Sequence, residues 1–103
     1  TNIGVTTVDK VVRETVEQAD MPKLILNLSD VSYLDSFSFG WIMKTYKEIR
    51  KKGGEFAICC PNEDILYLFE VTDFSRVVPA YRTEAEAREA IRTGNQSKRI
   101  VYI

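Results

Sequence analysis

The residues best suited to chemistry lie in one short stretch, "YLDSFSFGW" (residues 33–41), where a carboxylate and two hydroxyls interrupt an apolar run. Asp35 directly precedes Ser36, and Ser38 follows two residues later. A serine at the end of a strand can act as a nucleophile, accept a phosphoryl group, or cap the helix that follows. Each role makes a different demand on the rest of the chain.

The nucleophile role finds no support elsewhere in the sequence. The chain of 103 residues contains no histidine, so it has no Ser-His-Asp triad, no Cys-His pair and no imidazole ligand for a metal. It also lacks the G-x-S-x-G elbow of serine hydrolases. We therefore expect a protein that is not an enzyme and that holds neither a cofactor nor a metal.

The two cysteines, Cys59 and Cys60, are neighbours in the apolar run "EFAICC". Adjacent side chains of a strand point to opposite faces, so a disulfide between them would strain the backbone. We expect two free thiols, which suits a reducing, cytoplasmic location.

Length and charge restrict the possible partners. The chain fits one domain, and its 14 basic and 15 acidic residues give a net charge of −1. That balance provides no general attraction to nucleic acid or to anionic membranes. No apolar run approaches the roughly 20 residues that span a bilayer, and the first ten residues lack the layout of a signal peptide. We expect no direct nucleic-acid binding and no membrane insertion.

The remaining sequence alternates helical and strand patterns. Apolar residues recur at helical spacing over residues 6–19 and 39–49, whereas the short apolar runs 23–28 and 55–60 are typical of buried strands. A third helix begins after Pro61-Asn62. The run 76–81 predicts a short strand, confined to the edge of the sheet by Pro79.

Thr83 and Glu86 have the spacing of a capping box and predict a fourth helix that ends at Arg92. The order of elements predicts an α/β domain with about four helices and a four- to five-stranded sheet, largely parallel or mixed.

Three stretches together resemble the STAS domain family, and more narrowly the bacterial anti-sigma factor antagonists. They are "LILNLSDVSYLDS", "GWIMKTYKEIRKKGGEFAICCPNEDILYLFEVTDF" and "VVPAYRTEAEAREAI". The resemblance covers about residues 6–92 of a single domain, 1–103, and leaves 93–103 as an additional C-terminal segment.

The resemblance implies a regulator that works by switching partners. Such a domain binds an anti-sigma factor, itself a GHKL-type serine kinase, while its serine is unphosphorylated, and a PP2C-type phosphatase reverses the phosphorylation. In this family the first serine of Asp-Ser-Ser-Gly-Leu-Gly or Asp-Ser-Thr-Gly accepts the phosphate. The resemblance therefore implies Ser36 as the acceptor, with Ser38 as the alternative.

The motif around Ser36 is kept in part. Asp35, Ser36 and Gly40 hold their family positions, whereas the residues between them depart from the pattern. The departure also fits a second hypothesis, a scaffold or binding module that no longer switches, as in stress-signalling assemblies, lipid-transport complexes and anion transporters. The implied partner-binding residues are Asp35, Phe37, Ser38, Phe39, Gly40 and Trp41.

Two local questions stay open at the level of sequence. Ser36 or Ser38 could be the N-cap of the helix that follows. Phe39 belongs to the apolar stripe of that helix, but Phe37 and Trp41 share another face, which is either an exposed aromatic anchor or packed beneath a loop.

The C-terminal run "RIVYI" (residues 99–103) has the pattern of a strand. Members of the family normally have one or two strands before the first helix, whereas about five residues precede it here. We expect the run to pair with the sheet in place of such a strand, within one chain or across a strand-exchanged homodimer, because an uncovered apolar edge invites aggregation.

Overall fold

The computed structural model describes residues 5–18, 20–92 and 100–103. Four helices and four strands alternate along the chain, as the sequence predicts. In order they are α1 (Val5–Gln18), β1 (Lys23–Asn27), α2 (Ser36–Lys51), β2 (Glu55–Cys59), α3 (Glu63–Val71), the 3-10 helix η1 (Phe74–Arg76), β3 (Ala80–Tyr81), α4 (Glu84–Arg92) and β4 (Ile100–Tyr102).

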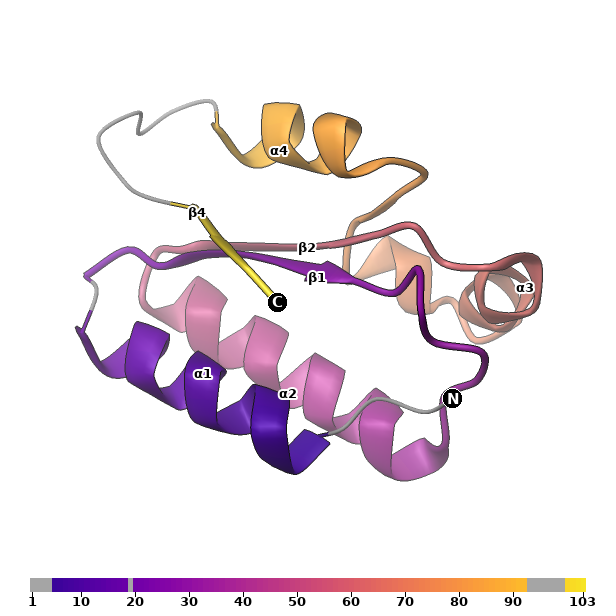
Figure 1. The fold of residues 1–103 in the computed structure, drawn as a ribbon, viewed down its shortest axis with the longest axis horizontal. Helices are drawn as coiled ribbons and strands as arrows, with labels where there is room; N and C mark the ends of the chain where they lie inside the picture. Colours follow the sequence, from indigo (N-terminus) through magenta and orange to yellow (C-terminus); the bar gives the residue numbers. More distant parts are fainter. Residues whose placement is uncertain (1–4, 19, 93–99) are drawn as a thin grey trace.

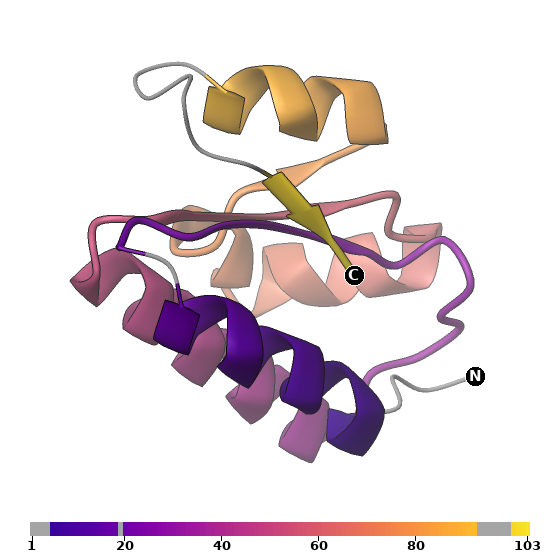
Figure 2. The ribbon, with the colours of Figure 1, turned by 60° about the vertical axis from the view of Figure 1, so that its left-hand side comes forward.

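The strands form one sheet in the order β3-β2-β1-β4, and every pairing is parallel. Helices α1, α2 and α3 lie on one face of the sheet, and α4 lies alone on the other (Figures 1 and 2). The central strands β1 and β2 are therefore covered on both faces. That explains their nearly continuous apolar sequences, which expose almost no residue.

The strand predicted over residues 76–81 is shorter than expected. Residues 74–76 form η1 instead, and β3 contains only Ala80 and Tyr81, at the edge of the sheet. Pro79 has no N–H to donate, but its carbonyl accepts a hydrogen bond from Ile58 N at 2.9 Å. The edge position is confirmed, whereas the length was wrong because the proline limits the ladder.

The turn between α2 and β2 depends on glycine. Gly53 has a φ of 76°, and a Cβ on Gly54 would lie 2.1 Å from the carbonyl oxygen of Pro22. This contact lets Glu55 N bond to that same oxygen at 2.9 Å, which starts the pairing of β2 with β1. The "GG" pair therefore sets where the central ladder begins.

The C-terminal strand β4 lies within the predicted run 99–103, of which residue 99 is outside the described residues. It pairs with β1 of the same chain, with Lys23 opposite Ile100 and Ile25 opposite Tyr102. Hydrogen bonds from Asn27 N to Ile103 O and from Ile103 N to Ile25 O, each 2.9 Å, extend the pairing. The edge of β1 is thereby covered within one chain.

Candidate functional site

The segment before α2 is held at the edge of the sheet where the central strands end. Leu28 N donates to Cys59 O at 2.9 Å, which ties the start of the segment to β2. Further along, the Asn62 side chain donates Nδ2–H bonds to Val31 O at 3.3 Å and to Ser32 O at 3.2 Å. The Oδ1 atom of Asn62 also accepts from Ile65 N at 2.8 Å and caps α3. One amide side chain thus positions both α3 and the approach to Ser36.

Asp35 is the N-cap of α2. Its backbone is extended, with φ −88° and ψ 174°, and its Oδ1 accepts a hydrogen bond from Ser38 N at 2.8 Å. The hypothesis that a serine caps this helix was wrong. A carboxylate at this position satisfies a free backbone N–H and also interacts favourably with the positive end of the helix dipole.

The two serines occupy opposite environments. Ser36 is the first residue of α2 and its side chain is exposed. Ser38, two residues further, turns inward and is fully buried at 0% exposure. The Ser38 side chain therefore does not project onto the surface beside Ser36.

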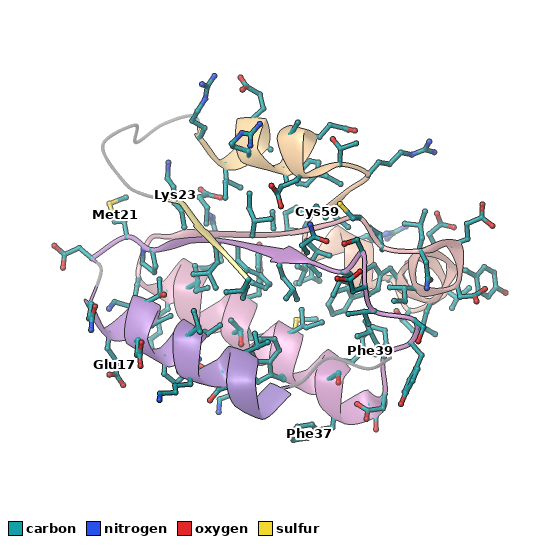
Figure 3. The ribbon with its side chains drawn as sticks, viewed as in Figure 1. Glu17, Met21, Lys23, Phe37, Phe39 and Cys59 are labelled. Carbon is teal, nitrogen blue, oxygen red and sulfur yellow. The ribbon has the colours of Figure 1, made fainter. Side chains whose placement is uncertain are left out.

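Two aromatic residues of the motif, Phe37 and Trp41, also differ in exposure. Phe37 is 70% exposed, whereas Trp41 is only 8% exposed and donates its indole N–H to Asp9 Oδ1 of α1 at 2.8 Å. Neither sequence hypothesis holds for the pair, because α1 covers the second turn of α2 but leaves the first turn open. Figure 3 shows Phe37 pointing away from the protein.

Phe39 points into the molecule, as its place in the apolar stripe predicts (Figure 3). Its ring meets Phe69 and Phe74 edge-on, at centroid distances of 5.8 and 5.2 Å, and those two rings stack at 4.7 Å. Phe39 thus packs the start of α2 against α3 and η1. The exposed hydroxyl of Ser36 is therefore carried by a rigidly packed helix.

Tyr33 is an exposed aromatic that the sequence analysis did not single out. It is 57% exposed, while its neighbour Leu34 is 8% exposed. No regular alternation of residue types before Asp35 marks Tyr33 as the exposed one of the two. In sequence, Ser36 is therefore flanked by two exposed aromatic residues, Tyr33 and Phe37.

The exposed side of α2 is strongly basic. Residues 36–52 contain five basic and one acidic residue, net +4, so the rest of the chain has nine basic and fourteen acidic residues, net −5. A shallow groove of about 540 Å³ runs along this helix and is lined by Gly40, Met43, Lys44, Lys47, Glu48 and Lys51. A Cβ on Gly40 would meet no atom within 4 Å, so the groove is open at this position.

Glu48 is the one acidic residue that lines this groove. It bonds to Arg13 of α1, and this hydrogen bond raises the pKa of the Arg13 guanidinium. The one carboxylate of α2 is thus engaged by α1, and Lys44, Lys47 and Lys51 give the groove a net positive charge.

Within the part of the chain that the structure describes, no group of three or more His, Cys, Asp or Glu side chains could hold a metal ion. In the same residues, no helix has the length and apolar character needed to cross a membrane.

The fold and the helix junction define a small α/β domain with an exposed serine after a capping aspartate. The family model of the STAS domain matches residues 3–87, so the chain belongs to the STAS domain family. The resemblance seen in the sequence is thus confirmed, and so is the fold class that it implied.

The relatives of this chain carry a consistent name. It is 43% identical over 70 residues to the "Putative anti-sigma factor antagonist" of Thermotoga maritima, covering 68% of this chain and 62% of that protein. It is 30% identical over 74 residues to the anti-sigma F factor antagonist of Paenibacillus polymyxa, covering 72% of this chain and 63% of that protein. The matches therefore span less than two thirds of either relative.

Solved structures agree with this assignment. The crystal structure of the Thermotoga maritima protein superposes with a TM-score of 0.76 and 37% sequence identity, over 88% of this chain and 79% of that one. The similarity therefore extends to the arrangement of nearly all the elements described above.

Proposed function

We propose that this chain is an anti-sigma factor antagonist of the cytoplasm, which binds an anti-sigma factor when Ser36 is unphosphorylated and releases it after phosphorylation. The observation that carries the proposal is the contrast between the two hydroxyls of the motif. Ser36 is exposed at the first position of α2, whereas Ser38 is fully buried and out of reach of a kinase. The names of the relatives support the general role.

The position of Ser36 suits a phosphate. The N-terminus of a helix presents free N–H groups and the positive end of the dipole, so it tolerates an added charge of about −1.5 to −2. Asp35 retains the cap by its bond to Ser38 N. Phosphorylation would therefore change the charge of the surface while the fold persists.

The partner surface consists of the exposed part of the motif. Asp35, Phe37 and Gly40 are exposed, and Phe37 offers a large aromatic side chain beside the acceptor. Ser38, Phe39 and Trp41 lie beneath them and hold the surface in shape. A phosphate in the middle of this surface needs to weaken binding by only about 2.7 kcal/mol to lower the affinity roughly a hundredfold.

In this scheme the domain is not an enzyme and needs no cofactor. A GHKL-type serine kinase, which is the anti-sigma factor itself, supplies ATP and transfers the phosphoryl group. A PP2C-type phosphatase removes it. The charge of α2 favours a partner with an acidic surface next to the aromatic contact.

The test uses the GHKL-type serine kinases of the source organism, each purified and incubated with this protein and ATP. We expect one kinase to add a single phosphate, located by peptide mass spectrometry at Ser36. Ser36→Ala should still bind that kinase but take up no phosphate, whereas the matched control Ser38→Ala should be phosphorylated at the wild-type rate.

Two results would overturn the switch. Phosphate on Ser38 would show that the acceptor is misassigned. Tight binding of a kinase without any phosphate transfer would favour the scaffold hypothesis.

A further inference from the structure

The side chains of the two cysteines belong to one cluster on one face of the sheet. Cys59, the last residue of β2, is buried at 0% exposure on the face of the sheet that α4 covers, in a cluster with Ala87 and Ile91. Cys60 is half-buried and packs against this same cluster. Both thiols are free, as expected, but the expectation that they point to opposite faces was wrong.

The cause is the backbone of Cys60. Its φ is 62°, in the left-handed region that side chains other than glycine rarely adopt, and the ladder of β2 ends at the residue before it. The peptide N–H of Cys60 donates to Tyr81 O at 2.9 Å, which holds this conformation against β3. The alternation of the strand is thereby broken, and the second side chain returns to the side of the first.

The two thiols are neighbours in this cluster. Burial raises the pKa of the Cys59 thiol to about 12, and a hydrogen bond with Cys60 adds to the rise. Cys59 is therefore a neutral thiol at physiological pH. Cys60, the more accessible of the two, is the residue that an external reagent meets first.

The number and spacing of the sulfurs limit what they can bind. Zinc in a structural site takes four ligands, and the described residues provide no cluster of even three. A direct disulfide is also disfavoured, since neighbouring Cα atoms are about 3.8 Å apart and disulfides usually join Cα atoms about 4.4–6.8 Å apart. An atom that needs two sulfur ligands and sits between them avoids both difficulties.

We propose that Cys59 and Cys60 form a dithiol site for a monosubstituted trivalent arsenical. Arsenic in this state is a soft, thiophilic centre with two exchangeable positions, which matches two adjacent thiols in number. Two As–S bonds form and two As–O bonds break, and each departing hydroxyl leaves as water with a thiol proton. The arsenic stays trivalent, so no oxidant or reductant is needed.

The site is independent of the proposed switch but lies at the same edge of the sheet. The Cys59 carbonyl accepts the 2.9 Å hydrogen bond from Leu28 N, where the segment leading to Ser36 begins. A group bound to the two sulfurs would therefore rest against the end of β2 that anchors this segment.

The test uses phenylarsine oxide and the full chain under native conditions. We expect intact-mass spectrometry to show one phenylarsenic group per wild-type chain, retained in a large excess of glutathione and removed by dithiothreitol. In Cys59→Ala and Cys60→Ser, the adduct has one As–S bond and should be lost to glutathione about a hundredfold faster, because the second bond is no longer intramolecular. The double variant should take up none.

A thermal measurement shows whether the arsenical binds the folded site or only the adjacent cysteines of the unfolded chain. A ligand that binds the folded protein raises the melting temperature, whereas one that binds only the unfolded chain lowers it. We expect phenylarsine oxide to raise the melting temperature of the wild type and to leave that of the double variant unchanged. A lowered melting temperature, or an adduct no more resistant to glutathione than those of the single variants, would overturn the proposal.

Discussion

Among the residues that the structure describes, α1, α2 and α3 enclose a core of fifteen buried residues on one face of the sheet, whereas α4 covers a cluster of five on the other. The larger face holds the stacked phenylalanines and large apolar side chains of the strands such as Leu24, Leu26 and Ile58. The smaller face includes alanine and cysteine, and polar groups such as Asn27, which donates to Glu84 at 3.2 Å. The comparison indicates that the larger face provides most of the stability and that the smaller face is the adaptable one.

The difference also separates the two candidate sites. The serine junction is carried by α2, which the larger core fixes from beneath through Phe39 and Trp41. The thiol pair lies on the smaller face, where one short helix of nine residues covers it. A switch on a rigid helix can change charge without changing shape, whereas a group bound at the thiols requires only the single helix α4 to shift.

The sharpest test of this contrast removes one large side chain from each face. Phe69→Ala should destabilise the protein by about 4 kcal/mol, because a fully buried ring stacked on Phe74 leaves a cavity that its neighbours cannot fill. Ile91→Ala on α4 should cost about 2 kcal/mol, since a single helix can shift to close the gap. Urea unfolding measures both, and equal losses would contradict the unequal roles of the two faces.

The difference between the wild type and a Cys59 variant at alkaline pH is a probe of the smaller face. The pKa of the Cys59 thiol is about 12 in the folded protein, whereas an unperturbed cysteine thiol, as in the unfolded chain, has a pKa of 9.0. Between these values the unfolded chain loses the proton that the folded chain keeps, so stability falls as pH rises above 9, by up to about 1.4 kcal/mol per pH unit from this group. Cys59→Ala should lose stability less steeply over this range than the wild type. Parallel curves would show that the thiol is not buried.

The helix caps offer a matched pair, one on each face. Asp35 Oδ1 accepts from Ser38 N at 2.8 Å, and Thr83 Oγ1 accepts from Glu86 N at 3.1 Å. Asp35→Ala and Thr83→Ala should each cost about 1 kcal/mol in thermal or urea unfolding. The first should also weaken binding to the anti-sigma factor, because it loosens the helix end that presents Ser36, and the second should leave binding unchanged. An equal effect on binding would remove Asp35 from the proposed surface.

The smallest expected effect on stability concerns the switch itself. Ser36→Asp places a negative charge at the first residue of α2, which the dipole accepts, so the melting temperature should stay close to that of the wild type. Calorimetry checks this, and binding to the kinase should meanwhile fall sharply. A variant that binds as well as the wild type would mean that charge at position 36 is not the signal.

Patterns that depend on one element were predictable from the sequence. Hydrophobic periodicity identified the helices and the central strands, and Thr83 with Glu86 gave the start of α4. Features set by contacts between elements were not. The length of β3 depends on Pro79 at the sheet edge, and the separation of Phe37 from Trp41 depends on how far α1 extends over α2.

The serine junction shows the same limit. Sequence placed Asp35, Ser36 and Ser38 at the start of a helix, but could not decide which residue caps it or which hydroxyl is exposed, since each type is a common cap. The conformation of Cys60 was not foreseen, because nothing in "EFAICC" marks the residue at which the strand ends and the backbone turns left-handed.

Asn62 uses both ends of its side-chain amide, as acceptor for Ile65 N and as donor to two carbonyls of the segment before α2. Asp, Ser and Thr cap helices well, but an ionised Asp has no donor to offer and the hydroxyls are too short to span both partners. In a saturation scan, position 62 should therefore reject even the substitutions that α3 alone would accept. Such intolerance would mark a surface residue on which two distant stretches of the chain depend at once.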